Sequence, residues 1–85
     1  MRAFESLQEQ SFKEVQQAIV ESFEVDSSEI TQDTSFKDLE IDSLERVELV
    51  VGLEKQLGIS LNTPQIQKCA TVGNLVDLIS AARNN

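Results

Sequence analysis

Apolar residues recur at helical intervals in three stretches of the chain, and no stretch alternates apolar and polar residues as a half-buried strand would. The first stretch predicts a helix over about residues 11–24, beginning at the capping-box pair Ser11 and Glu14. Ser6 and Glu9 have the same spacing and are an alternative start. The apolar face of this helix comprises Phe12, Val15, Ile19 and Phe23.

The second stretch has clearer boundaries. Asp42 is spaced as the N-cap of a helix, with Ser43 in its first position and Glu45 in its third. Gly58 ends this helix, because glycine readily adopts the left-handed angles that close a last turn. Arg46 points toward the apolar side, and we expect its stem to pack while its charged head reaches water. The predicted core face is formed by Leu49, Val50, Leu53 and Leu57.

Three further apolar residues, Leu44, Val47 and Val51, make the apolar arc of the second helix wider than one buried stripe requires. They lie directly beside Glu48. An apolar strip flanked by negative charge suggests a docking ridge for a partner protein. The alternative is that these residues fill the core of a small bundle, and the pattern favours neither interpretation.

Residues 25–41 form a long connection rich in turn and cap formers, and a brief helical turn is expected near Ser27–Ile30. Loops of this length in compact domains are usually functional, which draws attention to the segment just before Ser43. Spaced apolar anchors are expected to hold the loop on the core, namely Val25, Ile30, Phe36, Leu39 and Ile41.

After the second helix, Thr63–Pro64 predicts the start of a short third helix with proline in its first position, and Cys69 ends it. Thr71 is spaced as the N-cap of a last helix whose apolar residues include Leu75 and Ile79. The sequence therefore predicts an all-α fold. We expect a small four-helix bundle with three main helices, one short third helix and a long loop between the first two.

A chain of 85 residues allows one domain, which we place at residues 11–85 after an N-terminal lead-in of residues 1–10. It has 7 basic and 15 acidic residues, a formal net charge of -8 and no histidine. Without histidine there is no Ser-His-Asp triad, so we expect no enzymatic activity from the chain alone. The acid excess falls within residues 21–54, so partners should present basic surfaces and nucleic acid should be repelled.

No metal site is expected. One cysteine and no histidine leave carboxylates as the strong ligands, which does not suit zinc. Asp38, Glu40 and Asp42 alternate as the ligands of an EF-hand loop do. The glycine and the final glutamate that such a loop requires are replaced by Ser43 and Leu49, so this template fails.

The single cysteine, Cys69, cannot form an internal disulfide, and we interpret it as a small apolar residue at a helix end instead of a reactive thiol. No run of about 18 apolar residues is present, so membrane insertion is not expected. We expect a cytoplasmic monomer.

Residues 36–50, FKDLEIDSLERVELV, resemble the signature of the acyl carrier proteins. The resemblance continues through Leu53–Glu54, Leu57–Ile59 and Thr71–Val72, and it covers about residues 11–82. An Asp-Ser-Leu triplet alone is common and also fits an ordinary helix cap. Its combination with the following VELV, the later spacings and the acidity of the chain is specific.

The resemblance implies that Ser43 carries 4′-phosphopantetheine, attached from coenzyme A by a phosphopantetheinyl transferase, with Asp42 and Leu44 flanking the attachment. Acyl intermediates would be held as thioesters on this arm and presented to enzymes of fatty acid synthesis or a related pathway. A phosphodiester anion also suits a helix N-terminus, where free amides and the helix dipole favour negative charge. The expected partner contacts are the ridge residues Leu44, Glu45, Val47, Glu48 and Val51.

The chain departs from the family pattern in the loop before the serine, in the third helix and in the second helix, whose acidity Arg46 and Lys55 dilute. Glu40–Ile41 replaces the usual glycine and variable residue, so the loop before the serine is expected to differ in shape. Residues 62–68 contain no acid where familiar members have several, which suggests a specialised carrier serving one pathway. A peptidyl, aminoacyl or polyketide carrier, or an unmodified helical interaction subunit, remains an alternative. Expected lining for a sheltered acyl chain is Val47, Val51, Leu53, Ile59, Leu61 and Ile66.

Overall fold

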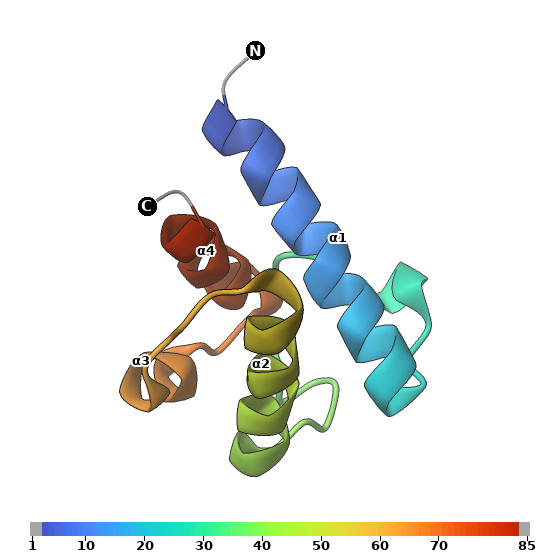
Figure 1. Ribbon diagram of the computed structural model, residues 1–85. Helices are drawn as coiled ribbons and strands as arrows, with labels where there is room; N and C mark the ends of the chain where they lie inside the picture. The colour runs from blue at the N-terminus through green and yellow to red at the C-terminus, as the bar shows by residue number, and fades with distance from the viewer. Residues whose placement is uncertain (1–2, 84–85) are drawn as a thin grey trace.

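A computed structural model describes the backbone of residues 3–83 and the side chains of residues 7–83 (Figure 1). Four helices and one short 3-10 turn make up the fold, and the described residues contain no strand. A single antiparallel bridge joins Ser35 to Thr71. The predicted all-α bundle with a long first loop is confirmed. Its elements are α1 (Ala3–Phe23), η1 (Ser27–Glu29), α2 (Ser43–Leu57), α3 (Thr63–Lys68) and α4 (Val72–Arg83).

The predicted start of the first helix is wrong. Helix α1 begins at Ala3, so residues 3–10 of the expected lead-in are helical and Ser11 lies inside the helix. The Ser11 side chain is fully buried, and its hydroxyl accepts a hydrogen bond of 3.4 Å from Arg83 Nη1. Ser11 therefore does not cap the helix, and its hydroxyl instead contacts Arg83 near the other end of the chain. The alternative cap at Ser6 has a side chain outside the described residues, and a domain boundary at residue 11 stays a prediction.

Helices α1 and α4 lie side by side and contribute much of the core (Figure 1). Val15 and Ile19 of α1 are fully buried, as are Leu75, Val76 and Ile79 of α4. Burying each such side chain stabilises the fold by about 1.5–3 kcal/mol relative to leaving it in water. This pair of helices is the framework on which the remaining elements rest.

The loop between α1 and α2 is fixed to the start of α4. The Val72 amide donates to the Thr34 carbonyl at 2.9 Å, and the Gly73 amide donates to the Gln32 carbonyl at 2.8 Å. The first amides of α4, which no helical carbonyl can accept, are thereby satisfied by the loop. The predicted anchors hold as well, since Ile30, Phe36 and Ile41 are buried and Val25 and Leu39 pack against the core. The loop thus places the start of α2.

The short helical turn predicted near Ser27–Ile30 is confirmed as η1. The Asp26 carboxylate caps it by accepting the Ser28 amide at 2.9 Å. Hydrogen bonds from the Ser28 backbone and side chain lower the pKa of Asp26 below its ordinary value. The turn is therefore held by local contacts and not by burial, because none of its residues is buried.

The start of α3 differs by one residue from the prediction. Asn62 is the N-cap, accepting the Gln65 amide at 2.9 Å, so Pro64 is the second helical residue and not the first. Adjacent Asn62 and Thr63 are both cap formers, and spacing alone did not separate them. The predicted end of the helix at Cys69 is confirmed. The predicted cap of α4 is also present, because the Thr71 hydroxyl accepts the Asn74 amide at 3.1 Å.

Candidate functional site

Helix α2 begins with the predicted capping box. The Asp42 carboxylate accepts the Glu45 amide at 2.8 Å, and the Glu45 carboxylate accepts the Asp42 amide at 3.0 Å. At the other end, Gly58 has φ of 68° and closes the helix as predicted. Both predicted boundaries are therefore correct, one set by a side-chain cap and the other by a left-handed glycine.

Ser43 is the first residue of α2, and its side chain is exposed. The capping box satisfies the amides of Asp42 and Glu45, while those of Ser43 and Leu44 have no hydrogen-bond partner among the described residues. Two free amides at the positive end of a helix dipole favour an anion. An exposed hydroxyl beside them is a fitting attachment point for a phosphodiester, whose charge these amides would stabilise.

The apolar ridge beside Ser43 lies partly outside the core. Leu44 is 68% exposed and Val51 is 40% exposed, while Val47 is half-buried and packs against the core. The core-filling alternative is therefore wrong for Leu44 and Val51. Glu48 is exposed on the same helix, so the surface combines apolar side chains with negative charge.

Arg46 does not extend into water as expected. Its Nη1 donates to the Cys69 carbonyl at 2.9 Å, and its guanidinium carbon lies 5.5 Å from the centre of the Phe36 ring. Its Nε is buried and has no hydrogen-bond partner in the described part of the chain. The side chain thus joins α2 to the end of α3 and to the loop. Because the guanidinium group is turned inward, it offsets the negative charge of the ridge less than its position in the sequence suggests.

Two comparisons with known proteins identify the family of this chain. The family of proteins described by a phosphopantetheine attachment site matches residues 13–79. An acyl carrier protein of Petrotoga mobilis (strain DSM 10674 / SJ95) is 39% identical over 74 residues, which cover 86% of this chain and 87% of that protein. The chain belongs to the acyl carrier protein family. It is a carrier and not an enzyme, and its prosthetic group is 4′-phosphopantetheine.

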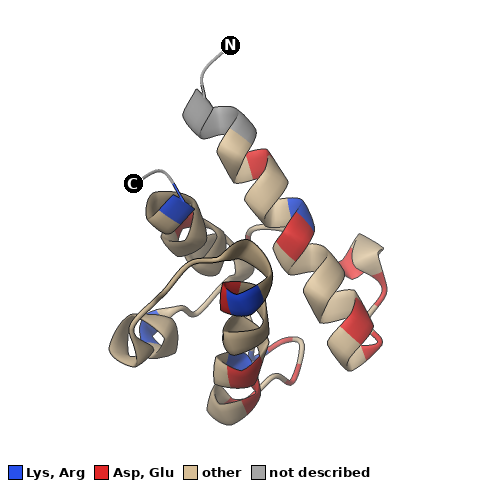
Figure 2. Ribbon diagram, in the orientation of Figure 1, with Lys and Arg blue, Asp and Glu red and all other residues tan. Residues whose placement is uncertain are grey.

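Acyl carrier proteins interact with a phosphopantetheinyl transferase and with biosynthetic enzymes. The charged residues that could take part in such contacts are unevenly distributed over the surface of this chain. Acidic residues gather on the loop, at the start of α2 and toward the end of α1, whereas the one charged residue of α3 is basic (Figure 2). That residue is Lys68. Attraction of a basic partner is therefore concentrated on α2 and its α1 side.

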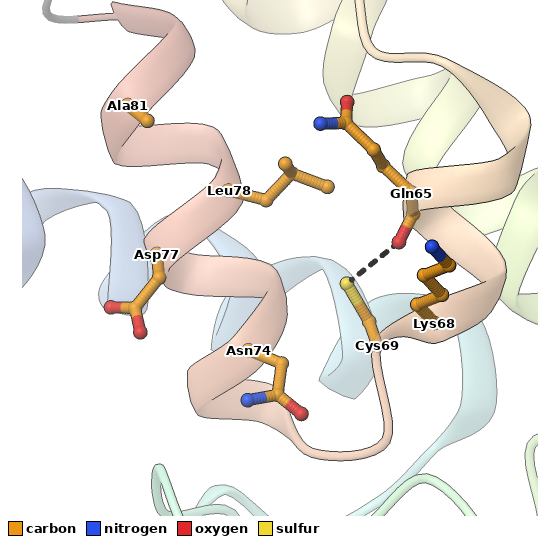
Figure 3. A pocket seen from close by; sticks show the side chains of 7 residues that line it. All are labelled: Gln65, Lys68, Cys69, Asn74, Asp77, Leu78 and Ala81. Atoms are coloured by element: carbon orange, nitrogen blue, oxygen red, sulfur yellow. Dashed lines mark hydrogen bonds between the residues drawn. The ribbon is translucent and has the colours of Figure 1, made fainter.

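A groove of about 410 Å³ lies between α3 and α4 (Figure 3). Cys69 lines it, and the Cys69 thiol donates to the Gln65 carbonyl at 3.4 Å. Burial raises the pKa of this thiol above its ordinary value, and the nearby Arg46 charge opposes the shift only in part. The thiolate is disfavoured, which agrees with the interpretation of Cys69 as a structural residue.

The predicted lining of an acyl shelter is not gathered around one groove. Leu61 lines a second groove of about 220 Å³ beside α4, and Leu53 lines a groove of about 200 Å³ between α1 and α2. Val47, Val51, Ile59 and Ile66 line none of these three grooves. Ile66 and Leu53 are core residues, almost fully buried. Periodicity could not separate core positions from lining, because both are apolar and face inward.

Two other kinds of site receive no support from the described residues. Among residues 7–83, no three His, Cys, Asp or Glu side chains gather as they would around a metal ion. None of the helices described here is both long and apolar enough to cross a bilayer.

Proposed function

We propose that Ser43 is the residue that receives 4′-phosphopantetheine from coenzyme A, and that the loaded protein presents acyl intermediates to biosynthetic enzymes. The observation that carries this proposal is an exposed serine at the first position of α2, next to two free amides. Asp42 keeps those amides in place by capping the helix, and Leu44 flanks the hydroxyl with an exposed apolar side chain. Both neighbours therefore belong to the attachment site.

The protein's own residues have three tasks at this site. The Ser43 oxygen provides the bond to phosphorus, the amides of Ser43 and Leu44 stabilise the resulting negative charge, and the capping box keeps the turn rigid. When attached, the arm supplies a terminal thiol that carries the acyl group as a reactive thioester. No base within this histidine-free chain is required, since the transferase would supply the base.

Intact-mass measurement tests the attachment. The purified protein is incubated with coenzyme A and a phosphopantetheinyl transferase, and we expect a gain of one phosphopantetheinyl group. Ser43→Ala should show no gain, whereas Ser60→Ala, which alters another exposed serine, should be modified normally. No gain in the wild type, or a gain that persists in Ser43→Ala, contradicts the proposal.

We further propose that partners bind the ridge formed by Leu44, Glu45, Val47, Glu48 and Val51 through an apolar contact surrounded by ionic ones. Glu48→Lys reverses one exposed charge outside the core. It should slow modification by about three- to tenfold at low salt and leave the helical circular dichroism signal unchanged, because complementary charges mainly speed association. Equal rates for Glu48→Lys and wild type at low salt would exclude this surface.

The absence of acids from α3 supports a specialised carrier that serves one pathway, such as a dedicated branch of fatty acid or related metabolism. Partners that need negative charge on α3 would bind it poorly. Equal turnover of the acylated protein by general fatty-acid ketosynthases and by a dedicated enzyme set would contradict specialisation.

We propose that the protein acts as a cytoplasmic monomer.

A further inference from the structure

A groove of about 200 Å³ between α1 and α2 lies on the α1 side of the ridge. Apolar atoms of Ala18, Leu49 and Leu53 contribute to its lining, and Leu49 and Leu53 are almost fully buried. Glu21 and Glu48 also line it, one from each helix, and both are exposed. The groove therefore combines an apolar floor with acidic edges, which suits a side chain that has an aliphatic stem and a positive head.

Gly52 lines this groove and adds no side chain to it. A Cβ atom built at Gly52 would meet nothing within 4 Å, so neither a close backbone approach nor a turn explains a glycine there. The contrast with the other glycines is clear, since Gly58 has φ of 68° and a Cβ at Gly73 would lie 2.7 Å from the Gln32 carbonyl oxygen. A glycine inside a helix costs roughly 1 kcal/mol relative to alanine. The fold gains nothing from this cost, whereas an incoming side chain gains space.

The acidic residues that line the groove have no basic residue beside them in the lining. No lysine or arginine is among the residues that line it. Glu14, at one end, is already paired with Arg83. Glu21 accepts a hydrogen bond of 2.9 Å from the Gln17 amide, and no basic residue lines the groove beside it. Two exposed carboxylates, Glu21 and Glu48, are thus available to a cation that enters between the helices.

We infer that this groove receives a lysine or arginine side chain of the phosphopantetheinyl transferase, an inference that rests on the function proposed above. The transferase is the partner to which the position points, because it acts on the Ser43 oxygen and must bind close to it. Glu48 is five residues along α2 from Ser43, a rise of about 7.5 Å. Enzymes that act on the cargo work at the far end of the arm and have no such constraint.

Filling the groove is the first test. Gly52→Met places a side chain in the groove without a clash at Cβ, and the melting temperature should stay the same or rise because methionine is the better helix former. With the transferase of the same organism, we expect KM for the carrier to rise about five- to tenfold while the rate at saturation is unchanged. Gln67→Met is the matched control, since it adds the same side chain at an exposed position of α3 outside the grooves described.

Neutralising one edge is the second test. Glu21→Gln should raise KM about two- to fivefold at low salt and much less at high salt. Glu29→Gln makes the same charge change at an exposed acid of η1 that does not line the groove, and it should have the smaller effect. Titration of labelled protein with the transferase should also shift the amide signals of Ala18 and Glu21.

The outcomes separate this inference from the function on which it rests. If the wild-type protein gains no phosphopantetheinyl group, the proposed function fails. If the wild type is modified and both Gly52→Met and Glu21→Gln keep the wild-type KM, the groove proposal is overturned and the proposed function stands. Unshifted signals of Ala18 and Glu21 beside shifted signals of Leu44 and Glu48 would likewise confine the transferase to the ridge.

Discussion

The α1–α4 pair and the α2–α3 pair use their apolar residues in different ways. Four apolar residues of α4 are buried, and α1 presents Val15 and Ile19 to the same core. In α3 only Ile66 is buried, and α2 leaves two large apolar side chains exposed. One pair thus contributes its apolar surface to stability, and the other keeps part of that surface for contacts outside the protein.

The two pairs also differ in how their polar groups are employed. At the α1–α4 contact the small residues Ser11 and Ser80 are fully buried, and Arg83 pairs with Glu14 at the edge. At α2, Asp42 caps the helix and Glu48 faces outward, whereas Arg46 turns inward to the Cys69 carbonyl. A carrier needs a rigid frame and an accessible face, and here separate helices supply them.

The largest expected effect comes from replacing one leucine with alanine in each of these two environments and comparing the two variants. Leu75→Ala should lower the free energy of unfolding by about 2–5 kcal/mol, because it leaves a cavity in the α1–α4 core. Leu44→Ala should change it by about 0.5 kcal/mol or less, yet slow modification of Ser43. Urea titration and modification rates measure both. Equal loss of stability in the two variants would remove the distinction between the helix pairs.

A second prediction concerns the link between α2 and α3. Arg46→Met removes the hydrogen bond to the Cys69 carbonyl and should cost about 1–2 kcal/mol, less than a charged hydrogen bond at its strongest because the orphaned Nε is removed too. Hydrogen exchange should quicken first in α3. Lys55→Met, at an exposed position of the same helix, should leave α3 protected. Unchanged protection of α3 in Arg46→Met would show that other contacts hold this helix.

A smaller gain is expected from relieving backbone strain. Glu24 and Glu40 have φ of 56° and 59°, which side chains with a Cβ seldom adopt. Glycine at either position should raise the free energy of unfolding by about 0.5–1 kcal/mol, since the cost of the left-handed angle slightly exceeds the entropic cost of glycine. Glu29→Gly, in η1, should instead destabilise. Falling urea midpoints in both Glu24→Gly and Glu40→Gly would contradict this reading.

The smallest effect concerns pH. Because burial raises the pKa of Cys69, the unfolded thiol ionises first as pH rises, so stability is complete below the ordinary pKa of 9.0 and declines above it. Cys69→Ala should remove this alkaline decline. Iodoacetamide should also alkylate the folded protein more slowly than the urea-unfolded one at pH 8. Equal alkylation rates in the two states would indicate an accessible thiolate.

Local chemistry made several parts of the structure predictable. The boundaries of α2 follow from Asp42, Glu45 and Gly58, whose side chains or backbone angles act within one turn of the helix. The cap of α4 at Thr71 is equally local. The proposed attachment site at Ser43 lies within such a segment, so an exposed serine at the start of α2 could be anticipated from the sequence.

Contacts between distant residues explain what the sequence did not reveal. Ser11 has the spacing of a cap but packs against α4 near Arg83, so α1 continues through it. Arg46 turns inward because a carbonyl 23 residues away, at Cys69, accepts a hydrogen bond from its guanidinium group. The groove at Gly52 forms only when α1 and α2 pack, and neither helix alone predicts it. Local patterns cannot carry such information, since they do not specify which surfaces meet.

Gly73 has a consequence that reaches beyond its own helix. Its missing side chain lets the α4 backbone approach the Gln32 carbonyl, and this contact helps to fix the loop that leads to Ser43. A single methyl group at position 73 would push that loop aside, although the residue is remote in sequence from the serine. Gly73→Ala should therefore leave the residues around Ser43 chemically unchanged while shifting the position of the Ser43 hydroxyl.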